Sequence, residues 1–262
     1  MKRLAIAVIA LALCPAAVLA AVKTETVTYT VGDKTFKGLI AFDDAVKGKR
    51  PGILVVHEFW GLDEYAKKRA KQLAGLGYVA FAVDMYGDGK TTEHPKEASA
   101  MAGMVRMNQK EWIARASAGL KILRNHPQCD GDKLAAIGYC FGGSTALTLA
   151  NAGVDIKAAV SFHGALPIPE EDGLKNVKAK VLICHGAADP LIKEETILKV
   201  RAAYEKAGVD YQMIYFGGAL HSFTVPEADS KKMSVLRYDP VADRRSWAAM
   251  RALFDEVFES KK

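Results

Sequence analysis

The fold is decided by one stretch of the chain, GYCFGG at residues 138–143. The apolar run at residues 133–137 predicts a short buried strand before it, and residues 144–150 predict a helix after it. A glycine-flanked cysteine between a strand and a helix is typical of a nucleophile elbow, a tight turn that holds a reactive side chain above the sheet. Side chains at Gly138 and Gly142 would not fit in so tight a turn.

Cys140, at the centre of this stretch, has two interpretations. The N-terminus of the helix that follows favours a negative charge, which would stabilise a thiolate. Cysteines are also commonly buried as structural residues. Because both glycines and both flanking elements are present, we favour the catalytic interpretation.

Residues 1–20 predict a secretory signal peptide. Lys2 and Arg3 precede an apolar run, and Ala20 ends a stretch of small residues suited to cleavage. No later stretch is long enough to span a membrane. We therefore expect residues 21–262 to form the mature protein, a single domain that is secreted and, in a Gram-negative host, periplasmic.

The composition is that of a globular protein. Half of the 262 residues are hydrophobic, so the chain can bury a sizeable core. The formal charge is +6, and removal of Lys2 and Arg3 lowers it by two, to +4. This charge is spread along the chain without a nucleic-acid-binding motif or an aromatic platform, so we expect no nucleic acid partner.

Three cysteines remain after cleavage of the signal peptide, namely Cys129, Cys140 and Cys184. An odd number of cysteines is a poor disulfide framework. The sequence leaves open a Cys129–Cys184 bridge in an oxidising compartment. Such a bridge would leave Cys140 free.

Strands and helices alternate along the rest of the chain. Residues 24–30 and 35–42 predict an N-terminal antiparallel hairpin. Further strands are expected at residues 53–56, 78–83, 133–137, 158–162, 181–184 and 211–216, and helices at residues 65–73, 97–124 (broken near Asn108), 144–150, 192–207 and 241–259. This alternation predicts an α/β protein with a mostly parallel central sheet and helices on both faces.

Four residues with catalytic potential directly follow predicted strands: Glu58, Cys140, Asp189 and His221. In open α/β sheets, functional sites are built at this C-terminal edge. The chain order nucleophile, acid, histidine is that of the α/β-hydrolase fold. Cys140 would attack a carbonyl carbon as a thiolate, His221 would carry protons, and Asp189 would hold the imidazole in one tautomer.

An oxyanion hole is expected beside the nucleophile. The backbone N–H of Phe141 directly follows Cys140, and the N–H of Phe59 lies in the loop after the first central strand. Taken alone, Asp189 would also suit a helix N-cap, and His221 would suit an ordinary loop. Their placement together favours the catalytic interpretation.

The mature chain resembles the dienelactone hydrolase family of α/β-hydrolases. The resemblance rests on five stretches: HEFWG at 57–61, DMY at 84–86, GYCFGG at 138–143, GAAD at 186–189 and HSF at 221–223. It implies a Cys-His-Asp triad that acts on lactones or esters. It also implies that Glu58 contacts the nucleophile and takes part in forming the thiolate, which is coherent chemistry for a carboxylate near a thiol. A purely structural role for Glu58 is the alternative.

Four side chains near the strand ends are expected to line the substrate pocket: Trp60, Tyr86, Tyr139 and His163. For Trp60 and His163, packing in the core explains the position equally well. Dienelactone-cleaving members of the family hold the substrate carboxylate with two arginines.

This chain has Asp88 and Val225 at the positions of those two arginines. Bidentate recognition of a carboxylate is therefore lost there. Lys90 would supply a point charge but no fork of donors. The fold and the triad are supported, whereas dienelactone itself is not expected as the substrate.

We therefore predict a hydrolase that cleaves carboxylic ester or lactone bonds through a thioester acyl-enzyme on Cys140. This reaction requires no metal or organic cofactor, and none is expected. The histidine and glutamate at 57–58 begin like a zinc-protease motif, but Gly61 stands in place of its second histidine. The partner would be a small-molecule ester or lactone, and the protein would be a monomer or small homo-oligomer. The alternative is a thiol-based redox or ligand-binding protein that uses the same pocket without hydrolysis, although the chain has no C-x-x-C pair.

Overall fold

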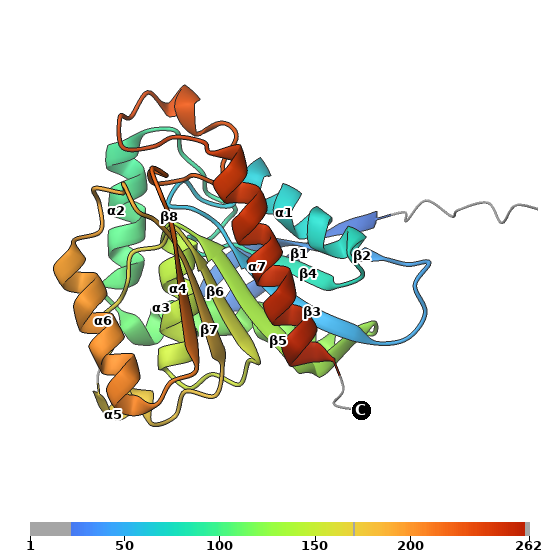
Figure 1. The fold of residues 1–262 in the computed structure, drawn as a ribbon. Helices are drawn as coiled ribbons and strands as arrows, with labels where there is room; N and C mark the ends of the chain where they lie inside the picture. The colour runs from blue at the N-terminus through green and yellow to red at the C-terminus, as the bar shows by residue number, and fades with distance from the viewer. Residues whose placement is uncertain (1–21, 170, 260–262) are drawn as a thin grey trace, which may run out of the picture.

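The computed structural model describes residues 22–169 and 171–259, which are built around one sheet (Figure 1). Within these ranges the sheet has eight strands in the order β1-β2-β4-β3-β5-β6-β7-β8. The strands are β1 (Val22–Val31), β2 (Lys34–Asp43), β3 (Arg50–Val56), β4 (Val79–Val83), β5 (Cys129–Tyr139), β6 (Ala158–Phe162), β7 (Lys180–Gly186) and β8 (Tyr211–Phe216). β1 and β2 form an antiparallel hairpin, β2 is antiparallel to β4, and the remaining pairings are parallel. The predicted α/β sheet with its N-terminal hairpin is confirmed.

Helices cover both faces of this sheet (Figure 1). They are α1 (Glu64–Gly75), α2 (Pro95–Arg106), α3 (Gln109–Asn125), α4 (Phe141–Asn151), α5 (Glu171–Leu174), α6 (Glu194–Ala207) and α7 (Pro240–Phe258), with a short 3-10 helix, η1, at Ala228–Lys231. Side chains of α1 and α7 form a hydrophobic core with one face of the sheet. Those of α2, α3, α4 and α6 form a second core with the other face.

Alternate residues of the central strands fill these two cores. In β3, Leu54 and Val56 belong to the core beneath α3 and α4, whereas Ile53 and Val55 belong to the core beneath α1 and α7. All four side chains are completely buried. Burial on both faces explains why the sequence of this strand is a continuous apolar run.

The helical region predicted over residues 97–124 is two helices, with the break where it was expected. α2 ends at Arg106. Oδ1 of Asn108 accepts a hydrogen bond from the Glu111 N–H at 3.1 Å and so caps the start of α3. α2 begins at Pro95, two residues earlier than expected, because proline suits the first position of a helix.

The turn at Cys140 has the backbone geometry of a nucleophile elbow. Its φ is +53° and its ψ is −111°, a conformation that residues with a side chain rarely adopt. A Cβ on Gly138 would lie 2.0 Å from the carbonyl oxygen of Gly142. A Cβ on Gly142 would lie 2.1 Å from the carbonyl oxygen of Val56. Since both contacts are with backbone atoms, only glycine fits at these two positions.

Replacement of Gly142 by alanine tests this steric requirement. We expect Gly142→Ala to lower the free energy of unfolding by about 3 kcal/mol, because the new methyl group would overlap the Val56 carbonyl. The matched control is Gly217→Ala, where a Cβ would meet no atom within 4 Å. The control should change stability by less than about 0.5 kcal/mol. Urea denaturation measures both values, and equal effects of the two substitutions would contradict the steric account.

The three cysteines in the described ranges are free thiols. Cys129 belongs to the core beneath α3 and Cys184 to the core beneath α7, so the sheet separates them. The Cys129–Cys184 bridge that the sequence left open is therefore not formed. Burial raises the pKa of the Cys129 thiol to about 12 and also raises that of Cys184. Both are poor nucleophiles for that reason.

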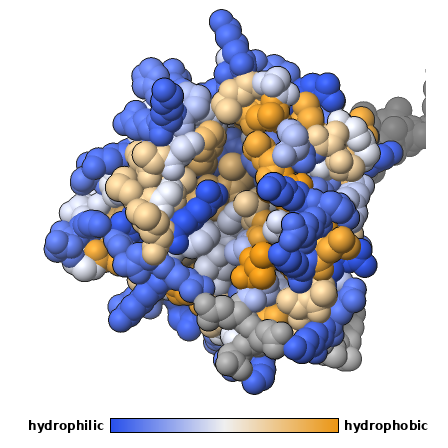
Figure 2. Space-filling model, turned by 90° about the vertical axis from the view of Figure 1, so that its left-hand side faces the viewer, coloured by the Kyte–Doolittle hydropathy of each residue, from blue (hydrophilic) through white to orange (hydrophobic). Residues whose placement is uncertain are grey.

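One face of the molecule is mostly hydrophilic. Figure 2 shows the face that carries α2 and α6, where smaller hydrophobic patches lie among hydrophilic side chains around a central hollow. Within the part of the chain that the structure describes, no helix combines the length and apolarity needed to cross a membrane. The predicted signal peptide, residues 1–20, lies outside the described residues, so export stays a prediction.

Candidate active site

The four residues predicted at strand ends lie at one edge of the sheet. Glu58 follows β3, Cys140 follows β5, Asp189 follows β7 and His221 follows β8. Cys140 is partly buried and the other three side chains are buried. Parallel strands bring their carboxyl ends to the same edge, which is how residues so far apart in sequence come together.

His221 and Asp189 form a buried hydrogen-bonded pair. The Nδ1–H of His221 donates to Oδ2 of Asp189 at 2.7 Å. Oδ1 of Asp189 accepts a second hydrogen bond, from the Leu191 N–H at 2.9 Å. α6 begins only at Glu194 and has Lys193 at its N-cap, so the N-cap interpretation of Asp189 does not apply.

The electrostatic surroundings favour the charged form of His221. Burial alone would lower the pKa of the imidazole, but interactions with Cys140 and Asp189 outweigh burial and raise the pKa well above its ordinary value. Cys140 stands at the N-terminus of α4, where the helix dipole favours a negative charge. The arrangement can therefore hold a thiolate beside an imidazolium, the reactive state of a cysteine nucleophile.

Glu58 is buried, interacts with the charge of His221, and is hydrogen-bonded to the loop that carries this histidine. The hydroxyl of Ser222 donates to Oε1 of Glu58 at 2.6 Å. Burial raises the pKa of Glu58 to about 7, although the Ser222 hydrogen bond and the charge of His221 act in the opposite direction. A carboxyl group with this pKa can hold or release a proton close to neutral pH.

Two backbone N–H groups are available where the oxyanion hole was predicted. Phe141 is the first residue of α4, and Phe59 lies in the loop after β3. Among the described residues, neither N–H has a hydrogen-bond acceptor. Tyr86 fixes the second loop, because its hydroxyl donates to the Phe59 carbonyl oxygen at 3.0 Å.

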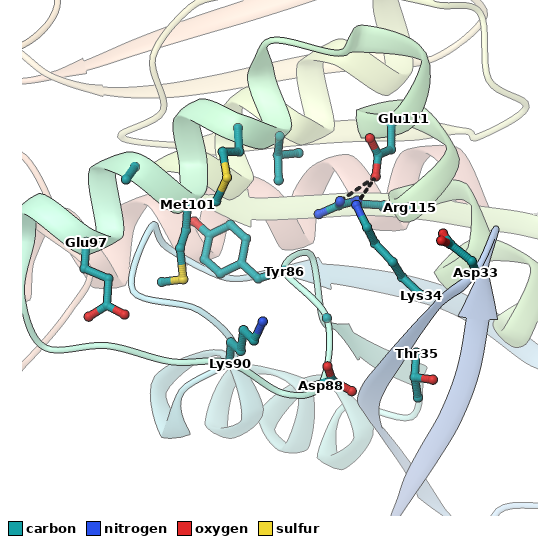
Figure 3. Close-up of a pocket in the computed structure, with 14 residues that line it drawn as sticks. Asp33, Lys34, Thr35, Tyr86, Asp88, Lys90, Glu97, Met101, Glu111 and Arg115 are labelled. Carbon is teal, nitrogen blue, oxygen red and sulfur yellow. Dashed lines mark hydrogen bonds and ion pairs between the residues drawn. The ribbon is translucent and has the colours of Figure 1, made fainter.

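A cavity of about 740 Å³ opens beside Tyr86 (Figure 3). Its walls come from the β1–β2 turn, the loop after β4, α2 and α3, and they combine methionines with charged side chains. Figure 3 shows Lys34 and Arg115 both paired with Glu111, whereas Lys90 reaches into the cavity. Tyr86 lines this cavity, and its predicted contact with the substrate stays a prediction.

A second cavity, of about 440 Å³, lies next to Glu58. Trp60, Ser222 and Val225 line it, and the predicted contact of Trp60 with the substrate stays a prediction. The Nζ of Lys231 lies 4.7 Å from the centre of the Trp60 ring, a cation–π contact.

The two positions that depart from the family pattern face these cavities. Asp88 lines the larger cavity and Val225 the smaller one. Neither residue has a guanidinium group. As expected from the sequence, neither position offers the paired N–H donors that bind a carboxylate in a bidentate manner.

Tyr139 was predicted to line the pocket, and this prediction is wrong. Its side chain is completely buried and stacks on Phe162 with ring centres 4.9 Å apart. Successive side chains of a strand point to opposite faces, and Tyr139 points into the core beneath α1 and α7. It does not line either of the two cavities described above.

The prediction that His163 lines the pocket is also wrong. The ring is completely buried, and its Nδ1 lies 3.2 Å from the backbone nitrogen of Cys140. His163 therefore supports the nucleophile turn from inside. Its other ring nitrogen contacts Thr224, a residue that the sequence analysis did not select.

Ser222, like Thr224, is a site residue that the sequence reasoning missed. The only available signal was its place directly after His221 in the chain. Within the described ranges, no group of three or more His, Cys, Asp or Glu side chains is arranged to hold a metal ion.

The sheet, the elbow and the order of these residues define an α/β-hydrolase. A model of the dienelactone hydrolase family matches residues 36–258, and the chain belongs to that family. As a member it is a hydrolase of the ester and lactone type.

The chain is similar over most of its length to the following three proteins. "Protein usf" from Aquifex pyrophilus is 29% identical over 213 residues, which cover 79% of this chain and 88% of that protein. A "probable 2-oxo-3-(5-oxofuran-2-ylidene)propanoate lactonase" from Bradyrhizobium sp is 23% identical over 211 residues, covering 77% of this chain and 82% of that protein. The crystal structure of a dienelactone hydrolase-like promiscuous phosphotriesterase from metagenomic libraries has a TM-score of 0.88 and 40% identity, covering 91% of this chain and 100% of that chain.

The pKa of Glu58 predicts a pH-dependent effect of its replacement. Folding raises this pKa from an ordinary value of 4.5 to about 7, so the folded protein loses stability relative to the unfolded chain as the pH rises through this interval. The difference corresponds to about 3 kcal/mol. We expect Glu58→Gln to raise the free energy of unfolding by about this amount at pH 8 and to leave it nearly unchanged at pH 4.

Urea denaturation at the two pH values measures this effect. The matched control is Glu25→Gln on β1, where the side chain is exposed and should have little influence at either pH. A loss of stability at pH 8 in Glu58→Gln would contradict the charge assignment.

Proposed function

We propose that this enzyme hydrolyses carboxylic esters or lactones through a Cys140–His221–Asp189 triad and a thioester acyl-enzyme. The proposal is carried by the buried His221–Asp189 hydrogen bond of 2.7 Å beside a cysteine held at positive φ at the start of α4. A nucleophile, a base and an orienting carboxylate are the parts that acyl transfer needs. Membership of the dienelactone hydrolase family and the lactonase relative support the same class of substrate.

In the first half of the reaction, the thiolate of Cys140 attacks the carbonyl carbon and forms a C–S bond. The carbonyl oxygen becomes an oxyanion, to which the N–H groups of Phe141 and Phe59 would donate hydrogen bonds. As the C–O bond to the leaving group breaks, His221 gives that oxygen a proton. An ester releases an alcohol, whereas a lactone opens and keeps its new hydroxyl group attached to the thioester.

In the second half, the neutral imidazole of His221 accepts a proton from a water molecule, whose oxygen attacks the thioester carbonyl carbon. The C–S bond breaks, and Cys140 leaves as the thiolate. His221 keeps the proton, so the ion pair is restored. Asp189 stabilises the imidazolium and holds its ring orientation through both halves.

Glu58 would accept or release a proton as the charges of the site change. Its pKa of about 7 allows it to exchange a proton near neutral pH, and its hydrogen bond to Ser222 links it to the loop that carries His221. These properties support a role as proton acceptor when the thiolate forms.

The larger cavity is linked to the elbow by Tyr86, whose ring centre lies 5.6 Å from that of Phe141, and a substrate that extends from Cys140 into it would be a neutral ester or lactone with an apolar body. Tyr86, Met101 and Met104 offer apolar contact surface in the larger cavity. Asp88 contributes a negative charge at a position where the family supplies a guanidinium. A carboxylate-bearing substrate would therefore gain little there beyond the point charge of Lys90.

Steady-state hydrolysis of a panel of aryl esters and lactones, with and without a carboxylate, tests this proposal. We expect turnover of the neutral members. Cys140→Ala should lower kcat/KM by more than about 1,000-fold, and Asp189→Asn should lower kcat strongly because the imidazole loses its tautomer control. The matched control is Asp132→Asn, an exposed residue of β5, which should keep the wild-type kcat.

Circular dichroism and thermal melting establish that each variant is folded. Turnover that persists in Cys140→Ala would show that the nucleophile is wrong. A wild-type protein that turns over no member of the panel but oxidises Cys140 reversibly would favour the redox alternative.

A further inference from the structure

His163 joins the nucleophile turn to the loop that carries the triad histidine. It follows β6, is completely buried, and has a positive φ of +42°. Its Nδ1 lies 3.2 Å from the Cys140 backbone nitrogen, and its Nε2 lies 2.8 Å from Oγ1 of Thr224. Each ring nitrogen therefore has one partner, and the two partners lie on different loops of the site.

The ring of His163 is neutral. Burial lowers its pKa well below the ordinary value, and the positive charges of His221 and Arg69 act in the same direction. The His221 ring is close, with ring centres 5.3 Å apart. A neutral imidazole carries its proton on only one of its two nitrogens.

The partners decide which nitrogen of His163 carries the proton. The backbone N–H of Cys140 is a donor, so Nδ1 must accept from it and be unprotonated. The proton is then on Nε2, which donates to the hydroxyl oxygen of Thr224. In the opposite tautomer, an N–H on Nδ1 would face the Cys140 N–H, and two donors would meet.

Two residues of α1 contact Thr224 directly, and one residue of α7 supports them. The Tyr65 hydroxyl lies 2.7 Å from Oγ1 and 3.0 Å from the carbonyl oxygen of Thr224. Arg69 donates to that carbonyl oxygen at 2.9 Å and to the Tyr65 hydroxyl at 3.0 Å. Asp243 of α7 pairs with Arg69 in turn. Thr224 itself is completely buried, so water does not compete for its hydroxyl group.

Glu58 is a second acceptor close to His163, and it would favour the opposite tautomer. Oε1 of Glu58 lies 3.9 Å from Nδ1 of His163. An ionised Glu58 would attract a proton to Nδ1, and this would break the hydrogen bond from the Cys140 N–H. The Thr224 hydroxyl opposes that shift when the Tyr65 hydroxyl donates to the Thr224 carbonyl oxygen and the Thr224 hydroxyl hydrogen is directed to the Tyr65 oxygen. Its oxygen is then available to Nε2 only as an acceptor, which favours the tautomer with the proton on Nε2.

We propose that Thr224 is a positioning residue for the nucleophile: it holds His163 in the Nε2–H tautomer and thereby keeps Nδ1 as an acceptor for the Cys140 amide. The kinetic consequence rests on the proposed hydrolase function, whereas the tautomer does not. The Cys140 N–H also donates to the Phe162 carbonyl oxygen at 3.0 Å. Loss of Thr224 therefore misaligns the turn and does not abolish it.

The experiment combines kinetics with NMR of protein labelled with ¹⁵N in its histidines. Thr224→Val removes the hydroxyl group at nearly constant shape, and Thr224→Ser restores it. We expect Thr224→Val to lower kcat roughly tenfold with KM changed less than about twofold, and Thr224→Ser to recover most of the loss. The His163 resonances, assigned by their absence in His163→Gln, should show Nε2–H in the wild type and a shift toward Nδ1–H in Thr224→Val.

Thr148→Val is the matched control for the loss of a buried hydroxyl group. Thr148 is buried in α4, where its hydroxyl donates to the Ser144 carbonyl oxygen at 2.8 Å. This variant should keep the wild-type tautomer of His163 and the wild-type kcat.

Several outcomes would overturn the proposal. Nδ1–H in the wild type would do so without any variant, and so would an unchanged tautomer in folded Thr224→Val. A wild-type protein that hydrolyses nothing while Thr224→Val changes the tautomer would overturn the proposed hydrolysis and support the tautomer control. In that case, the rate of Cys140 alkylation by iodoacetamide replaces kcat, and it should fall in Thr224→Val.

Discussion

The close approach of backbone around Cys140 is the constraint on which the rest of the site depends. The turn lies so near to neighbouring segments that glycine is also required at position 143, directly after the Gly138–Gly142 stretch. A Cβ on Gly143 would lie 2.6 Å from Oγ of Ser161 and 3.0 Å from Cα of Gly164. This tight packing starts α4 directly at Phe141, and so sets both the direction of the Cys140 side chain and the position of the N–H group that follows it.

The charges of the site follow from burial and from one specific pair of partners. His57, His163 and His185 also lie near the strand ends, and burial lowers the pKa of each of them. His221 is just as buried, yet its pKa is raised, because Asp189 and Cys140 both contribute negative charge beside it. Among these rings, the surroundings thus select one histidine to carry a proton at neutral pH, and the other three remain neutral.

Much of this site could be predicted from sequence because its chemistry is tied to strand ends. Cys140, Asp189 and His221 each follow a predicted strand, and parallel strands must present their ends at one edge. The elbow was equally predictable, since only glycine on both sides of the cysteine permits the turn.

The remaining features depend on tertiary contacts that no local pattern carries. Whether Tyr139 points to the pocket or into the core is set by which face of the sheet the strand presents at that residue. Thr224 and its partner Tyr65 are 159 residues apart in the chain, so their hydrogen bond leaves no local trace in the sequence. The same holds for the support that His163 gives to the Cys140 amide.

The most direct test of the central claim is the intact mass of the wild-type enzyme, acid-quenched within the first turnover of an aryl ester. Our account predicts a transient mass increase equal to the acyl group, located on the peptide that contains Cys140, which disappears once the ester is consumed. An acyl group on any other residue, or complete turnover with Cys140 unmodified at every quench time, would contradict covalent catalysis at this elbow.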